Sequence, residues 1–189
     1  VVCVPGDVMA SVSPMKSPQG VLFAGRIPTL TPPEKLTGRR YVALEGVQDP
    51  GNVGAVLRTL DAFDGDGLFL LPGCADPYSP KTLRSSMGAL FRRPVWFCSA
   101  SELCRLLQRS GLPLYGAALR LDTLDARTVD LTRAAVAIGS EGRGLSQELL
   151  ALCDGTVRIP MSPRCESLNA AVAASVLLWE GYRVSDGRE

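Results

Sequence analysis

The 189-residue sequence contains no histidine. This absence excludes catalytic triads and dyads that use a histidine base, and it removes a common zinc ligand. The six cysteines are scattered and form no C-x-x-C pair, so we expect reduced thiols and no metal site. Any acid–base chemistry must therefore use carboxylates, arginine, lysine, tyrosine or the substrate itself.

Long apolar runs are also missing from the sequence. No stretch approaches the roughly 18 residues that a membrane-spanning helix needs, and the first residues lack the basic region and apolar core of a secretory signal. We therefore expect a cytoplasmic protein without a membrane partner. The chain does not begin with methionine, so we expect it to be part of a longer protein.

Neither sign of charge dominates. Twenty lysines and arginines face 19 acidic residues, for a net charge of +1, which argues against a general binder of polyanions. Most of the cations are arginines, however, and arginine suits bidentate contacts with phosphate. The arginines are therefore compatible with an RNA partner. The simpler interpretation is an arginine-rich surface that is solvated.

The hydrophobic content of 46% is enough for a real core, and its pattern predicts two regions. Residues 1–38 are rich in proline, serine and glycine, a composition that is typical of a linker. From Tyr41 onward, short apolar runs alternate with amphipathic segments. We expect strands at 41–45, 67–71, 94–98, 112–119, 134–139 and 155–160, and helices at 52–63, 80–88, 101–110, 146–153 and 168–183, with Ser101 capping the third helix.

This alternation of nearly continuous apolar strands with helices predicts an α/β fold. Its sheet should be mostly parallel, with helices on both faces. Ligands of such sheets bind where loops leave the carboxyl ends of the strands, which directs attention to loops 45–54, 139–145 and 160–169. The glycines of 139–144 have the spacing G-x-x-G-x-G. That spacing is neither the dinucleotide-binding fingerprint nor a P-loop, which disfavours a nucleotide-dependent oxidoreductase.

The three loops carry three motifs in order: N-x-G-A-x-x-R-T at 52–59, G-x-E-G-x-G-L-S at 139–146 and I-P-M-x5-S-L-N at 159–169. Together they resemble the motifs of the SpoU–TrmH family of RNA ribose 2′-O-methyltransferases, within the SPOUT superfamily. The resemblance covers about 39–185. It implies a catalytic domain at 39–189 whose carboxyl-terminal part is threaded into a trefoil knot. Pro163 departs from the pattern, because family members commonly have glycine there.

The same resemblance implies that S-adenosylmethionine is the cofactor and that Gly139, Ile159 and Leu168 contact it. Methyl transfer from a sulfonium to an oxygen requires neither a metal nor a histidine. Taken by itself, the glycine-rich loop that begins at Gly139 equally suits a tight turn between a strand and a helix.

For the catalytic step, the resemblance implicates Arg58 as the group that activates the ribose hydroxyl. An arginine does not readily give up its proton, so we expect Arg58 to orient the hydroxyl and the phosphate and to stabilise developing alkoxide charge. The residues expected to position Arg58 and the ribose are Asn52, Glu141, Ser167 and Asn169. The simpler alternatives are a surface pair of Arg58 with Asp61, and plain helix caps at Ser167 or Asn169.

The resemblance also bears on partners. It implies a homodimer formed through the final helix, and we expect a charge at Leu178 to disrupt the contact. Segment 13–25 resembles the end of the family's small RNA-binding domain, so 1–38 is interpreted as a remnant of that domain plus a linker, and rRNA is favoured over tRNA. Alternatives are a tRNA ribose methyltransferase, a base methyltransferase that shares the knot, and a catalytically silent ribosome-assembly factor.

Overall fold

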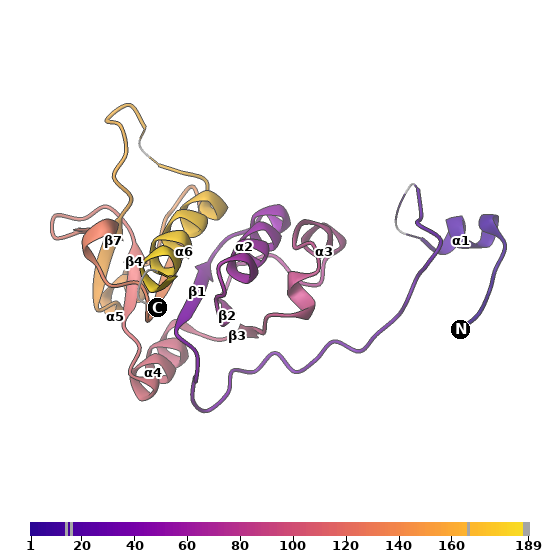
Figure 1. Ribbon diagram of the computed structural model, residues 1–189, viewed down its shortest axis with the longest axis horizontal. Helices are drawn as coiled ribbons and strands as arrows, with labels where there is room; N and C mark the ends of the chain where they lie inside the picture. The colour runs from indigo at the N-terminus through magenta and orange to yellow at the C-terminus, as the bar shows by residue number, and fades with distance from the viewer. Residues whose placement is uncertain (14, 16, 166, 187–189) are drawn as a thin grey trace.

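In the computed structural model, which describes residues 1–13, 15, 17–165 and 167–186, the main body is one parallel sheet with helices on both faces (Figure 1). Pro14, Lys16 and Glu166 belong to segments quoted above and lie outside the described residues. The strands are Arg40–Glu45 (β1), Gly67–Leu70 (β2), Val95–Phe97 (β3), Leu114–Ala117 (β4), Leu124–Asp125 (β5), Ala134–Gly139 (β6) and Gly155–Arg158 (β7). Their order in the sheet is β3-β2-β1-β6-β4-β7-β5, and every pairing in this described sheet is parallel.

The helices are Gly6–Val12 (α1), Pro50–Ala62 (α2), Pro80–Ser85 (α3), Ala100–Ser110 (α4), Gln147–Leu152 (α5) and Ala170–Asp186 (α6), with 3₁₀ turns at Ala89–Phe91 (η1) and Ala126–Thr128 (η2). On one face of the sheet, α2 and α6 bury apolar side chains such as Leu57 and Leu177. On the other face, α4 and α5 bury side chains such as Leu103 and Leu149. The predicted α/β architecture with a parallel sheet is confirmed.

Local chemistry explains where the elements differ from the expectation. Helix α2 begins two residues earlier than predicted, because Asp49 accepts a hydrogen bond from the Gly51 backbone N–H (2.8 Å) and Pro50 occupies the first turn. The prediction that Ser101 caps α4 was wrong. Ser99 caps that helix in a reciprocal box with Glu102, which satisfies two backbone N–H groups at once.

The final helix also corrects an expectation. Leu178 is only 4% exposed and packs in the hydrophobic core of the chain, so it does not face a partner. The exposed apolar side chains of α6 are Val172 (47%), Val176 (37%) and Trp179 (47%). Their spacing of four and three residues places them on one stripe of the helix. In a helix that is apolar almost all round, the sequence alone does not indicate which side meets the sheet.

The segment before β1 follows the edge of the sheet. The backbone N–H of Phe97, in edge strand β3, donates to the Leu30 carbonyl (2.8 Å), and the Leu36 N–H donates to the hydroxyl of Ser110 (3.0 Å). These contacts anchor the linker to the body of the protein, whereas α1 buries no side chain. Among the helices of the described residues, none is both long and apolar enough to cross a bilayer.

Candidate functional site

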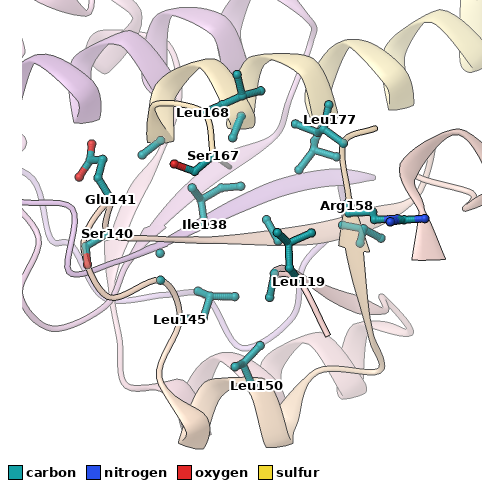
Figure 2. A pocket seen from close by; sticks show the side chains of 18 of the residues that line it. Leu119, Ile138, Ser140, Glu141, Leu145, Leu150, Arg158, Ser167, Leu168 and Leu177 are labelled. Atoms are coloured by element: carbon teal, nitrogen blue, oxygen red, sulfur yellow. The ribbon is translucent and has the colours of Figure 1, made fainter. Parts of the chain in front are cut away.

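A cavity of about 570 Å³ opens at the carboxyl ends of strands β4, β6 and β7 (Figure 2). Because the strands are parallel, the loops that follow them converge at this edge of the sheet. The cavity is lined by Ala117, Ala118, Leu119, Arg120, Ile138, Gly139, Ser140, Glu141, Arg143, Gly144, Leu145, Gln147, Leu150, Val157, Arg158, Ile159, Met161, Ser167, Leu168, Ala170, Ala173 and Leu177. Its size lies within the range of about 300–1,000 Å³ that is usual for small-molecule sites.

The glycine-rich loop after β6 folds back tightly on itself. The Gly144 N–H donates to the Ser140 carbonyl (2.8 Å), and these two residues form an isolated antiparallel bridge. A Cβ atom on Gly139 would lie 2.1 Å from the carbonyl carbon of Gly144 and 2.4 Å from the nitrogen of Leu145. Since both neighbours are backbone atoms, position 139 accepts glycine alone without a shift of the loop.

All three predicted cofactor contacts come together in this cavity. Gly139 is the last residue of β6, Ile159 follows β7, and Leu168 lies just before α6, and all three line its wall. Glu141 and Ser167, expected to act in catalysis, line it as well. The structure thus brings segments that lie almost 30 residues apart in the sequence to the wall of one cavity.

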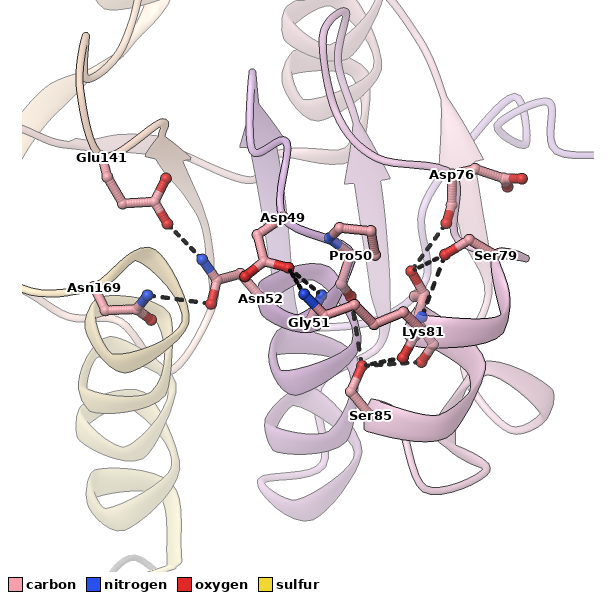
Figure 3. A network of polar contacts seen from close by, with 11 residues as sticks. Asp49, Pro50, Gly51, Asn52, Asp76, Ser79, Lys81, Ser85, Glu141 and Asn169 are labelled. Carbon is pink, nitrogen blue, oxygen red and sulfur yellow. Dashed lines mark hydrogen bonds and ion pairs between the residues drawn. The ribbon is translucent and has the colours of Figure 1, made fainter. Parts of the chain in front are cut away.

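The three motifs are joined by a chain of hydrogen bonds through Asn52 (Figure 3). The Asn52 side-chain amide donates to a Glu141 carboxylate oxygen (2.5 Å), and its carbonyl oxygen accepts from the Asn169 amide (3.1 Å). The Asn169 carbonyl oxygen in turn accepts the Ala171 N–H (2.9 Å), which caps α6. Asn169 therefore acts both as a helix cap and as a link to motif one.

Arg58, the predicted activating residue, lies away from the cavity. It is exposed on α2, about 9 Å along the helix from Asn52 at 1.5 Å per residue, and it does not line the cavity. The predicted alternative, a pair with Asp61, was wrong, because Asp61 binds Arg92 (2.7 Å) and Arg93 (2.8 Å) instead. The hydrogen bond from Arg92 lowers the pKa of the Asp61 carboxyl, against the opposing effect of burial. The side chain of Arg58 makes no hydrogen bond or ion pair with the rest of the described chain.

Several residues of the cavity wall were not predicted from the sequence. Arg120, Arg143 and Arg158 line the wall, and the side chain of Leu119 borders it although Leu119 is 67% exposed. Arg158 and Leu119 also border a second, neighbouring cavity of about 660 Å³. Their position at the carboxyl end of a strand, or within four residues of it, was a usable signal, but a single arginine at a strand end is also common on solvated surfaces.

The thiols and carboxylates do not form a metal centre in the part of the chain that the structure describes, where no group of three potential ligands converges. All six cysteines are free. Burial raises the pKa of the Cys98 thiol to about 12 and that of the Cys153 thiol to about 11, so both are protonated at neutral pH. They are therefore poor nucleophiles, and we assign them no catalytic role.

Comparison with known proteins agrees with the motifs. Residues 39–179 match the model of the SpoU rRNA Methylase family. The chain is 34% identical to the 23S rRNA (guanosine(2553)-2′-O)-methyltransferase RlmP of Bacillus subtilis, with 92% of this chain and 68% of that protein covered. It is 38% identical to an uncharacterised tRNA/rRNA methyltransferase of Synechocystis, with 95% and 66% covered. The chain spans 45% of a similar Mycolicibacterium gilvum protein.

Solved structures extend the likeness to the fold. An AdoMet-bound rRNA methyltransferase from Sinorhizobium meliloti superposes with a TM-score of 0.82 at 32% identity, covering 95% of this chain and 70% of that one. The SpoU methyltransferase AviRb from Streptomyces viridochromogenes, in complex with AdoMet, gives 0.72 at 36% identity, with 78% and 60% covered. The family model, the relatives and the folds agree, and the chain therefore belongs to the SpoU family of methyltransferases.

Proposed function

We propose that the protein transfers a methyl group from S-adenosylmethionine to a ribose 2′-hydroxyl of RNA. The observation that carries this proposal is the hydrogen-bond chain Glu141–Asn52–Asn169, which joins all three motifs beside one cavity. A catalytically silent RNA-binding protein would have no need to keep this polar network at the rim of a small-molecule site.

The cavity suits S-adenosylmethionine. Apolar side chains of Ile138, Ile159 and Leu168 offer a surface for an adenine ring, and the strand ends offer backbone hydrogen-bond groups. Arg120, Arg143 and Arg158 at the same wall are available to a carboxylate. When bound, S-adenosylmethionine supplies an activated methyl group on a sulfonium. The resemblance to the family supports, as part of the proposal, a trefoil knot formed by the segments around this cavity.

Within this proposal, the residues of the chain position and polarise the ribose. Arg58 orients the hydroxyl and the adjacent phosphate and stabilises negative charge on the oxygen as it attacks, while a phosphate oxygen accepts the proton. Four polar residues position the ribose and Arg58 relative to one another: Asn52, Glu141, Ser167 and Asn169. An arginine that has no carboxylate partner in the described chain is free to bind a phosphate.

We expect S-adenosylmethionine to stabilise the wild-type protein against heat. A ligand at about 100 times its dissociation constant stabilises the folded state by about 2.7 kcal/mol. For a chain of this size that corresponds to a rise in melting temperature of about 5 °C or more. Differential scanning fluorimetry measures the shift, and NAD at the same concentration serves as the control. A shift with NAD and none with S-adenosylmethionine would contradict the proposed cofactor.

We also propose that the active form is a homodimer. Arg58 lies outside the cavity of its own subunit, and α2 packs directly beside α6. The α6 stripe formed by Val172, Val176 and Trp179 exposes apolar side chains next to that arginine-bearing helix. A two-fold contact through α2 and α6 would cover the stripe and bring Arg58 of one subunit toward the cavity of the other.

Val176→Glu should weaken the dimer at least about tenfold, because it places a charge in an apolar interface. Methyl transfer should fall in proportion to the dimer that is lost. Multi-angle light scattering over a dilution series measures the assembly state. Phe97→Glu is the matched control, since Phe97 is also exposed (45%) but lies on β3 at the far edge of the sheet. A fully active wild-type monomer at assay concentration would contradict the dimer.

The substrate RNA is proposed to be ribosomal, acted on in the cytoplasm, with residues 1–38 contributing the end of a small RNA-binding domain ahead of the catalytic domain at 39–189. The alternative substrate is a tRNA ribose. This alternative is supported by relatives that are described as tRNA/rRNA methyltransferases. The deciding experiment incubates the full-length protein with labelled S-adenosylmethionine and total RNA that lacks the modification. Mapping the labelled nucleotide distinguishes rRNA from tRNA, and absence of any label would favour the silent assembly factor.

A further inference from the structure

The last residue of β1 holds the start of α5. One carboxylate oxygen of Glu45 accepts the Ser146 backbone N–H (2.7 Å), and the other accepts the Ser146 hydroxyl (2.7 Å). The same hydroxyl oxygen accepts the Leu149 N–H (3.1 Å) and caps the helix. Glu45 therefore fixes the final residue of motif two through both of its carboxylate oxygens.

The other end of loop 139–146 is held by segment 45–52, the segment that begins with Glu45. Asn52, seven residues after Glu45, donates to Glu141 near the beginning of motif two. Between these two anchors the chain lies beside the loop. Glu45 is paired with Gly139 across the sheet, and Gly46 turns with a φ of +66° next to the Ser140 side chain. Segment 45–52 thus brackets the loop at both ends.

The bracketed loop needs such support. Gly142, Arg143 and Gly144 are exposed, and the loop contains three glycines. Glycine loses more conformational entropy on ordering than any other residue. Since Gly139, Ser140, Glu141, Arg143, Gly144 and Leu145 form part of the cavity wall, a loop that is ordered before the ligand arrives binds it with a smaller entropic cost.

We propose that Glu45 is a positioning residue for the cofactor. It acts through Ser146 to hold loop 139–146 in the shape that receives S-adenosylmethionine, and it does not line the cavity itself. This role rests on the proposed function. The competing interpretation is that Glu45 only stabilises α5, in which case its loss would lower the stability of the protein without changing the cofactor affinity of the folded form.

Glu45→Ala should weaken S-adenosylmethionine binding about tenfold, the scale of losing a charge-assisted hydrogen bond. Isothermal titration calorimetry measures the affinity. In kinetics, KM for the cofactor should rise by a similar factor while kcat changes little. Glu148→Ala is the control, because Glu148 is an exposed carboxylate in the first turn of α5 without a hydrogen bond or ion pair to the described chain. Glu45→Gln keeps the side-chain length and one acceptor, and should recover most of the affinity.

A second measurement separates positioning from mere stability. In the ligand-free protein, Glu45→Ala should accelerate hydrogen exchange in loop 139–146 and leave β4 unchanged. The double variant Glu45→Ala/Ser146→Ala should bind the cofactor no more weakly than Glu45→Ala, because Glu45→Ala already removes both hydrogen bonds between the two residues.

The outcomes that overturn the role are distinct. Wild-type affinity in a folded Glu45→Ala protein, or additive losses in the double variant, would overturn the role of Glu45 alone. If Glu45→Ala fails to fold, Ser146→Ala decides, because it removes the hydroxyl that donates to Glu45, and wild-type affinity in that variant overturns the role. A wild-type protein that binds no S-adenosylmethionine would overturn the proposed function, and the role of Glu45 with it.

Discussion

Arg58→Ala is expected to slow methyl transfer at least about a hundredfold, the scale of losing one donor that stabilises transition-state charge. Affinity for S-adenosylmethionine should barely change, because Arg58 does not line the cavity of its own chain. Single-turnover assays with saturating cofactor and RNA measure the rate, and calorimetry measures the affinity. Arg58→Lys should restore activity only in part, since a point charge does not reproduce the guanidinium fork.

A matched control is Arg109→Ala, which removes an exposed arginine from α4 on the opposite face of the sheet. It should leave the rate close to that of the wild type. Near-normal turnover by Arg58→Ala would contradict the assignment and return Arg58 to the role of a solvated surface residue.

Mixing two inactive variants shows which subunit supplies the arginine. If Arg58 serves the cavity of the partner, a heterodimer of Arg58→Ala and Gly139→Val contains one site with both an intact cavity and an intact arginine. Random pairing should then recover about a quarter of wild-type activity, because about half of the dimers are mixed and each has one working site. No recovery, although mixed dimers are shown to form, would place Arg58 in the cavity of its own subunit.

Gly139→Val is expected to abolish detectable binding of S-adenosylmethionine. The first atom of any side chain at this position would lie 2.1 Å from the backbone of Gly144, so the loop must move and the cavity wall moves with it. Even Gly139→Ala should weaken binding markedly, because overpacking against rigid neighbours costs about 1–3 kcal/mol. Calorimetry measures the affinity, and circular dichroism should show an intact fold, because the distortion is confined to one loop.

The same loop offers the control. A Cβ atom on Gly142 would meet nothing within 4 Å, so Gly142→Ala should bind the cofactor nearly as the wild type does. Equal losses in the two variants would mean that the loop tolerates no substitution of any kind. Unchanged affinity in Gly139→Val would remove this loop from the cofactor site.

Much of the fold was readable from local patterns. The apolar runs of β1 and β6 are continuous because both faces of a parallel sheet are covered, and all the strands and helices that we expected between 41 and 183 are present, with shifted ends. The ends shifted where a particular cap decided them, as at Asp49 and Ser99. Strand β5 has two residues and α1 buries no side chain, so neither has the apolar period by which such elements are found.

Membership of the SpoU–TrmH family was predicted from the three motifs and is confirmed. The order and spacing of their polar residues are properties of the chain itself, and they need no coordinates to be recognised. By itself the sequence therefore determined the architecture, the family, and the set of residues to examine, with Gly139 and Asn52 among them.

Only the tertiary structure decided which of those residues meet. In the tertiary structure Asp61 pairs with Arg92 and Arg93, which leaves Arg58 without that partner, and Arg58 lies outside the cavity of its own chain. The tertiary structure turned Leu178 into the core and left Val176 and Trp179 outside. These outcomes depend on contacts between side chains that lie far apart in the sequence, such as Asp61 and Arg92. Local periodicity carries no information about such distant pairs, because the way the helices pack on the sheet determines them.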